Sequence, residues 1–321
     1  MLLRVEPVET KAAPTVGRPD VSASPLTKLR GVILLAGTVR ANSLRRGVDR
    51  FLLELPMDHQ RSIMDSWHAH LASMAERCGF DRLPVRVIVD RSTPTPAASK
   101  WNGRIELTFE QDPFEFRGTG GLLCDIAWQY EDDDYLLVAN GPQILYEPLS
   151  ILTESLAKLD ADIAMVRQPD GTPGGMMLVR CGAVRVIPRV GFIDLNEQAL
   201  PMIAKQHDVR IWAHPNATGL PIRTLGGYLE AVREYHRRLC GRADAGDLLA
   251  EDWQATFNLI EPGAKVDASA VVHDSVVLAG AQVDAGALLV RAVVCPGAHV
   301  LMRQSAIDRL VAPRVAIPRK T

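Results

Sequence analysis

The C-terminal part of the chain repeats itself with a 17-residue period. The tetrads Gly263-Ala264-Lys265-Val266, Gly280-Ala281-Gln282-Val283 and Gly297-Ala298-His299-Val300 carry glycine, alanine and valine at matching positions. Aliphatic residues recur about every six positions within each repeat. Such a period is typical of a triangular β-helix, in which one aliphatic side chain per side points inward and small residues permit tight corners. Two series of aliphatic residues follow the six-residue spacing and are candidates for inward positions. They are Ile260, Val266, Val272 and Leu278, and Val271, Val277, Val283 and Leu289.

The preceding 200 or so residues alternate apolar runs with amphipathic segments. Residues 31–36 form a continuous apolar run, as expected of a strand that is buried on both faces. The alternation predicts an α/β domain with a mainly parallel sheet covered by helices. Further strands are expected at 85–89, 105–109, 135–139, 163–166, 176–179, 184–187 and 209–213, and helices at 63–78, from Pro148 onward, and at 227–239. Asp194, with Glu197 three residues later, predicts a helix cap with its reciprocal partner.

With 321 residues, the chain is long enough for two domains. Residues 1–28 are rich in proline, serine and charge, and predict a flexible N-terminal tail; the alternative is a short strand at 2–5. The α/β domain is expected over 29–240 and a linker over 241–258. A left-handed β-helix domain is expected over 259–321.

The composition of the chain indicates which binding partners and which cellular compartment to expect. The net charge is −2, and no basic excess or basic run indicates a nucleic-acid or anionic-membrane partner. No run approaches the roughly 20 apolar residues that a membrane helix needs. The five cysteines are scattered and form no CxxC pair, which favours a reducing compartment. We therefore expect a cytoplasmic protein.

A candidate phosphate-binding loop follows the first strand. Ala36, Gly37, Thr38 and Arg40 lie between that strand and a helix, where loop and helix N–H groups converge on an anion. The alternative is a solvated basic loop. Four arginines are available to hold a phosphate by charge-assisted hydrogen bonds: Arg40, Arg45, Arg46 and Arg50.

A second candidate site is a glycine-rich turn. Glu115 is followed by the run Gly118-Thr119-Gly120-Gly121, which opens an apolar helix. Glycines at such a turn permit close approach of the backbone to a ligand. The alternative is an ordinary loop at the start of a helix. A third candidate, Asn140-Gly141, ends the strand at 135–139.

At these places the sequence resembles the sugar-1-phosphate nucleotidylyltransferases of the mannose-1-phosphate guanylyltransferase type. The family motifs LAGGxGTRLxPL, PKPLL, EPLGTAGAL, NGD and DLEEQLLP align with segments that begin at Leu35, Asp49, Glu115, Asn140 and Asp194, respectively. The resemblance covers about residues 30 to 303. It implies a Rossmann-like nucleotidyltransferase domain followed by a β-helix. It also implies nucleotide contacts at Ala36, Gly37, Thr38, Arg40, Arg50, Glu115, Gly118, Thr119, Gly120, Gly121, Asn140 and Gly141.

The departures from the family pattern affect the positions that carry out the reaction in that family. Thr38 and Arg40 replace glycines of the family loop, and Arg50 replaces its lysine. Pro142 and Thr224 stand where the resemblance places two Mg²⁺-binding aspartates. The EKP segment that follows the strand at 163–166 in the family is also missing. We therefore expect no metal-binding residues, a need for Mg²⁺ only if the chain is active, and Arg50 as the one candidate catalytic residue.

Three functions follow. The first is a catalytically impaired relative that binds a nucleotide or nucleotide sugar, or acts as a regulatory or structural subunit in nucleotide-sugar or polysaccharide metabolism. The second is an active nucleotidylyltransferase that joins a nucleoside triphosphate and a sugar 1-phosphate and releases pyrophosphate. The third is an acyltransferase of the β-helix, with His273 or His299 as catalytic histidine. A homo-oligomer, or a heteromer with an active paralogue, is expected.

Overall fold

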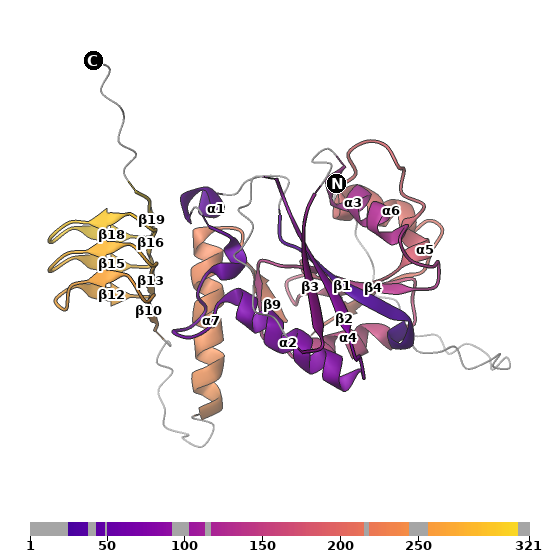
Figure 1. Cartoon of the computed structure of the whole chain (residues 1–321), viewed down its shortest axis with the longest axis horizontal. Helices are drawn as coiled ribbons and strands as arrows, with labels where there is room; N and C mark the ends of the chain where they lie inside the picture. Colours follow the sequence, from indigo (N-terminus) through magenta and orange to yellow (C-terminus); the bar gives the residue numbers. More distant parts are fainter. Residues whose placement is uncertain are drawn as a thin grey trace, which may run out of the picture.

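The computed structural model describes residues 25–37, 43–48, 50–91, 103–112, 117–214, 218–243 and 256–313. These form an α/β part and a C-terminal stack of short strands, which lie on either side of the long helix α7 (Leu225–Ala243) (Figure 1). The expected tail at 1–28 and linker at 241–258 lie mostly outside the described residues, and both stay predictions. None of the described helices combines the length and apolar character of a membrane span.

The α/β part is built on a seven-stranded sheet with strand order β3-β2-β1-β4-β7-β6-β8. β1 (Leu29–Leu35) lies between β2 (Leu83–Val89) and β4 (Tyr135–Asn140) and is parallel to both. β7 (Pro173–Arg180) is antiparallel to its two neighbours, so the sheet is mostly parallel, as the sequence predicts. The remaining strands are β3 (Ile105–Gln111), β6 (Ile163–Arg167) and β8 (Val209–Ala213).

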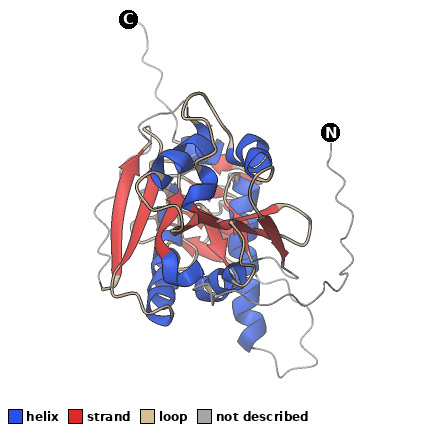
Figure 2. Cartoon of the chain, turned by 90° about the vertical axis from the view of Figure 1, so that its right-hand side faces the viewer, coloured by secondary structure: helices blue, strands red, loops and turns tan. Residues whose placement is uncertain are grey.

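Helices cover both faces of this sheet (Figure 2). Val32 and Leu34 of β1 pack with the helices of one face, and Ile33 packs with those of the other, because successive side chains of a strand point to opposite sides. This explains the unbroken apolar run of β1. The first face carries α2 (Ile63–Arg77), α4 (Leu149–Ala157) and α7, and the second carries α3 (Gly118–Ala127), α5 (Cys181–Val184), η3 (Leu195–Ala199) and α6 (Leu200–Ile203).

Local signals in the sequence set the ends of α2. Ser62 accepts a hydrogen bond from the Asp65 amide, and the Asp65 carboxylate accepts from the Ser62 amide, which forms a capping box. At the other end Gly79 takes a φ of +72°, a conformation that glycine adopts without strain. The helix expected from Ile63 to the glycine is therefore present.

Two local expectations are corrected. The predicted strand at 184–187 is wrong: Cys181–Val184 is a helical turn, and Ala183, Val184 and Ile187 are buried on one side of the segment. The apolar spacing there reflects helical burial rather than alternation. Asp194 does cap a helix, but its reciprocal partner is Gln198, not Glu197. The turn is a π-helix, whose wider i→i+5 spacing moves the partner one residue along the chain.

The C-terminal strands form three small parallel sheets that the chain visits in turn. Val266 pairs with Val283, and Val283 with Val300, so the chain returns to each sheet once in every sequence repeat. This winding, called the C-terminal coil below, is compatible with the expected β-helix. Its sheets are β10 (Asn258–Ile260), β13 (Ser275–Val277), β16 (Val293–Val294) and β19 (Leu310–Val311); β11 (Lys265–Val266), β14 (Gln282–Val283) and β17 (His299–Val300); and β12 (Val271–His273), β15 (Leu288–Val290) and β18 (Ser305–Ile307).

The inward positions of the coil follow a 6-6-5 spacing rather than a strict six. The side chains that pack inside it are Val266, Val272, Val277, Val283, Leu289, Val294, Val300, Ala306 and Val311. Ile260 and Val271, expected inside, are 38% and 56% exposed. Leu278 is buried, but against the α/β part. A 17-residue period leaves one side of the triangle a residue short, so a constant step of six slips onto the wrong face.

One side of the coil is buried on both faces. Val277 and Val294 point into the coil, while Val276, Leu278 and Val293 belong to the same core as Tyr228 of α7. A second set of contacts fixes the coil against α7. Arg233 of α7 forms an ion pair of 2.8 Å with the buried Asp274, and His236 stacks on Phe257 with ring centroids 5.8 Å apart.

Candidate functional site

A cavity of about 720 Å³ lies at the carboxyl ends of the parallel strands. Leu35 of β1, Asn140 of β4 and Val166 of β6 all line it. The chain builds the sheet outward from β1 through β2 to β3 and then returns to place β4 on the other side of β1. In open α/β sheets, ligands bind outside the carboxyl ends of the strands at such a reversal. The fold thus places the cavity where the architecture favours a ligand.

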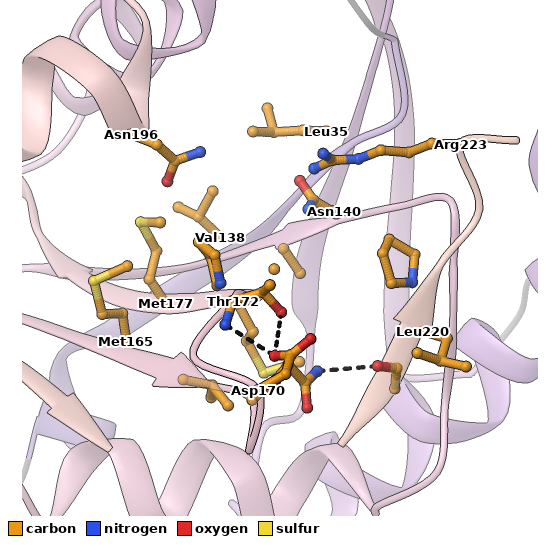
Figure 3. Close-up of a pocket in the computed structure, with 18 of the residues that line it drawn as sticks. Leu35, Val138, Asn140, Met165, Asp170, Thr172, Met177, Asn196, Leu220 and Arg223 are labelled. Atoms are coloured by element: carbon orange, nitrogen blue, oxygen red, sulfur yellow. Dashed lines mark hydrogen bonds between the residues drawn. The ribbon is translucent and has the colours of Figure 1, made fainter. Parts of the chain in front are cut away.

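The cavity is lined by apolar residues together with a smaller set of charged and amide side chains. Val138, Met165, Met176, Met177 and Leu220 are among the apolar residues that line it. Figure 3 shows Leu35, Asn140 and Arg223 at the top of the view, and Asp170 toward the bottom. The charged and amide side chains of the lining are Asn140, Gln168, Asp170, Asn196, Arg223 and Glu230.

Gly175 brings the chain close to two amide side chains beside the cavity. Its φ is +70°, and a Cβ at this position would lie 2.8 Å from Asn140 Nδ2 and 3.2 Å from Gln143 Oε1. Gln143 is only 2% exposed, and within the described chain its Nε2 has no hydrogen-bond partner. A buried donor left unpaired costs about 1–3 kcal/mol. Asn140, which lines the cavity, and Gln143 thus both lie close to Gly175, and they are called the amide pair below.

Three of the predicted loop and strand-end residues come together beside the cavity. The Gly141 amide donates to the Leu35 carbonyl at 2.9 Å, and a Cβ on Gly141 would lie 3.1 Å from that of Ala36. Gly37 packs so closely on the end of β2 that a Cβ would lie 2.3 Å from the Asp90 amide. Thr38 and Arg40, the next residues expected to bind phosphate, lie outside the described residues.

Two arginines near the predicted phosphate loop have carboxylate partners. Arg45 forms an ion pair with Asp90 at the end of β2. Arg50 donates from Nη1 to both carboxylate oxygens of Glu261, at 2.9 and 3.1 Å, and from Nη2 to the Glu54 carbonyl. Glu261 belongs to the C-terminal coil, and Arg50 does not line the 720 Å³ cavity. The structure therefore places Arg50 in the contact between the two parts.

The glycine-rich turn is packed against another segment of the same chain. A Cβ on Gly118 would lie 2.5 Å from the Ile193 carbonyl oxygen, and the Gly120 amide donates to that oxygen at 2.9 Å. The Thr119 hydroxyl accepts a hydrogen bond from the Leu195 amide at 3.1 Å. Gly121 faces the Arg117 side chain. These contacts give the turn a packing role, and Glu115 lies outside the described residues.

The two positions that the resemblance assigns to Mg²⁺ ligands do lie close together. The Ile222 amide donates to the Pro142 carbonyl, and β5 (Gln143–Leu145) pairs with β9 (Gly219–Pro221). Neither Pro142 nor Thr224 offers a carboxylate, and the Thr224 hydroxyl accepts from the Gly227 amide at the start of α7. Within the described residues no three His, Cys, Asp or Glu side chains gather as a metal site. Pro142 and Thr224 therefore supply no carboxylate oxygen to a Mg²⁺ ion at these two positions.

Asp170, in the cavity lining, is held by its own turn. Its carboxylate accepts hydrogen bonds from the Thr172 hydroxyl at 2.7 Å and from the Thr172 amide at 2.9 Å. These bonds lower the pKa of Asp170. It is thus an ionised acceptor, and both it and the cationic Arg223 belong to the lining of the cavity.

Several lining residues escape sequence reasoning. The methionines of β6 and β7, Met165, Met176 and Met177, belong to no motif. The available signal was the Gly174-Gly175 pair at the start of β7, because adjacent glycines in a strand mark a close approach of the backbone to other groups.

Comparisons with known proteins give partial similarities in fold. HddC from Yersinia pseudotuberculosis aligns at 14% identity and a TM-score of 0.47, over 64% of this chain and 100% of that one. The same protein complexed with GMP-PN gives 15% identity and a TM-score of 0.46, over 64% of this chain and 100% of that one. A Bacillus anthracis protein named as a glucose-1-phosphate thymidylyltransferase, in complex with sucrose, aligns at 13% identity and a TM-score of 0.49. That alignment covers 63% of this chain and 93% of the other. No family model and no curated protein matches the chain.

Proposed function

We propose that this chain binds a nucleotide or a nucleotide sugar in the cavity at the ends of β1, β4 and β6, and that its nucleotidyl-transfer chemistry is impaired. The observation that carries the proposal is the position of the 720 Å³ cavity at the chain reversal of the sheet, beside Ala36, Gly37 and Gly141. The resemblance of the sequence to sugar-1-phosphate nucleotidylyltransferases names the ligand class.

The lining suits a ligand with one flat apolar part and one anionic part. Met165, Met176 and Met177 offer polarisable, adaptable surface to a ring. The Asn140 amide supplies a donor and an acceptor for a base or a sugar hydroxyl. Arg223 supplies a cation in the lining, able to form charge-assisted hydrogen bonds with a phosphate.

Other residues, outside the cavity lining, support impaired chemistry. Transfer of a nucleotidyl group depends on positioning and on stabilising the charge that develops on phosphate oxygens. Arg50, the candidate for the family's lysine, is engaged by Glu261, and Pro142 and Thr224 replace the two aspartates. Loss of one such stabilising group commonly costs a factor of 10²–10³ or so in rate.

We further propose that residues 259–321 form a left-handed β-helix, and that this unit gives the protein a regulatory or structural role in a homo-oligomer or in a heteromer with an active paralogue, in the cytoplasm. The regular return of the chain to the three parallel sheets supports the β-helix. Analytical ultracentrifugation of the chain alone and with such a paralogue tests the assembly.

The binding proposal is tested by thermal unfolding with a panel of nucleoside triphosphates and nucleotide sugars, with and without Mg²⁺. A ligand at 100 times its Kd should stabilise by about 2.7 kcal/mol. The substitution Leu220→Trp adds bulk in the cavity and should abolish the shift. Ile211→Trp, on the exposed side of β8, is the matched control and should retain it. Metal-independent stabilisation without pyrophosphate release supports the proposal, whereas metal-dependent turnover overturns the impairment.

One observation favours the acyltransferase as a second candidate. His299 Nε2 lies 2.8 Å from Asp284 Oδ2 on the outer face of the coil, an arrangement in which a carboxylate orients an imidazole. Incubation with an acyl-CoA should then yield acyl transfer that is lost in His299→Gln. Its absence would leave the nucleotide-binding function as the surviving candidate.

A further inference from the structure

The C-terminal coil ends in an open face at β17, β18 and β19. A cavity of about 310 Å³ lies at this end, and Val300, Ala306 and Val311 line it. These are the inward residues of the three sides in the last coil. In the preceding coils the inward residues are covered by the next turn of the chain. Among the described residues nothing continues the stack beyond this coil.

The backbone of the last coil is oriented toward a further strand. In the sheet β11-β14-β17, amides donate forward to the following coil: Lys265 to Ala281, and Gln282 to Ala298, both at 2.9 Å. Asp267 and Asp284 likewise donate to Val283 and Val300, at 3.0 Å. The amides of His299 and Leu301 are the corresponding donors of the last coil, and the 17-residue period matches their acceptors in the sequence to residues 315 and 317. Within residues 256–313, the Leu301 amide donates to the Gln304 side chain, at 3.4 Å.

The sequence supplies the residues that this position requires. Ile317 stands one repeat after Val300, as Val300 stands one repeat after Val283, so an aliphatic side chain falls on the next inward position. Val315 falls on the position of the buried Ala281 and Ala298, and Ala316 on the exposed position of His299. Pro313, the last described residue, already lies against Gly297, with its Cβ 3.7 Å from where a glycine Cβ would be.

One position departs from the repeat, and the coil itself shows that the departure is tolerated. Arg314 falls on the corner where Gly263, Gly280 and Gly297 take φ values of +94°, +80° and +72°. At another corner Gly286, with φ of +65°, is followed one period later by Arg303 with φ of +57°. An arginine therefore already replaces a glycine at a left-handed corner of this coil.

We propose that residues 314–317 dock on the open end of the coil as a fourth strand of the sheet β11-β14-β17, with Ile317 filling the 310 Å³ cavity. The occupant of this surface is thus the chain's own C-terminal segment rather than a second copy. A terminal cover of this kind is required in repeat architectures, because an uncovered end exposes apolar side chains and unpaired strand edges.

Amide hydrogen exchange on the full chain tests the docking. Ile317→Asp places a charge in the cavity and should speed exchange of the His299 and Leu301 amides by about tenfold or more. Ala316→Asp, one residue away on the exposed face, is the matched control and should leave both amides protected. Ile317→Val, which keeps an aliphatic group, should also retain protection. Unchanged exchange of amides in β1 verifies that the fold survives each substitution.

Two results overturn the proposal. In the first, Ile317→Asp and Ala316→Asp have the same effect on the two amides, so the register is wrong. In the second, protection of His299 and Leu301 rises with protein concentration and is insensitive to Ile317→Asp, so a second copy covers the end instead. Neither result bears on nucleotide binding, because the open end and the 720 Å³ cavity share no lining residue.

Discussion

Arg50 of the α/β part and Glu261 of the C-terminal coil are joined by two hydrogen bonds, of 2.9 and 3.1 Å, from one guanidinium nitrogen. Both side chains are largely shielded from solvent, at 23% and 14% exposure. Glu261 also accepts the Ala279 amide at 2.7 Å. Arg50 therefore joins the two parts of the molecule through a shielded contact.

From this contact we expect Arg50→Ala to lower the free energy of unfolding by about 1–3 kcal/mol, the cost of removing a hydrogen-bonded partner from a shielded carboxylate. Arg82→Ala breaks a pair with Glu106 in which both side chains are exposed, at 72% and 43%, and should cost less than about 1 kcal/mol. Urea unfolding of the two variants measures both losses in the free energy of unfolding. A double-mutant cycle with Glu261→Gln isolates the pair. An Arg50→Ala protein of normal stability that no longer binds nucleotide would instead make Arg50 a ligand residue.

Gly175 offers a test of the amide pair beside the cavity. Gly175→Ala should displace Asn140, because the new Cβ would lie 2.8 Å from its Nδ2, and should weaken the thermal stabilisation by ligand. Gly171→Ala is the matched control: its φ of +86° imposes a comparable backbone strain of about 1–2 kcal/mol, but nothing lies within 4 Å of its Cβ. Equal loss of ligand effect in both variants would count against the amide pair.

The glycine-rich turn provides a third prediction. Thr119→Val keeps the shape of the side chain but removes the hydroxyl that accepts the Leu195 amide. We expect a loss of about 1 kcal/mol in the free energy of unfolding and no change in the ligand-induced shift. Thr119→Ser, which retains the hydroxyl, serves as the control. If Thr119→Val instead lost ligand binding at unchanged stability, the glycine-rich turn would be part of the ligand site.

The features that the sequence predicts correctly are those that repeat over a short stretch of chain. The strand β1 is visible because both of its faces are buried, and the coil is visible because Val266, Val283 and Val300 stack in register. The partners of Arg50 and Gly118 are not visible, because Glu261 and Ile193 are remote from them along the chain and only the fold brings them close. The same limit hides the cavity lining, since β7 enters the sheet between β4 and β6 out of sequence order.

The last prediction concerns pH. His236 of α7 stacks on Phe257, its Nε2 lies 3.1 Å from the Met57 carbonyl, and burial lowers its pKa, with Asp58 and His59 as the nearby charged and titratable groups. Because the unfolded chain takes up the proton first, stability is fully present above about pH 6.5 and falls as the pH drops below it. His70, whose pKa burial also lowers, contributes in the same direction. Urea unfolding at pH 8 and pH 5.5 should show a smaller pH-dependent loss in His236→Gln than in the unmodified chain. An identical loss in both would assign the dependence to His70, and His70→Gln would then remove it.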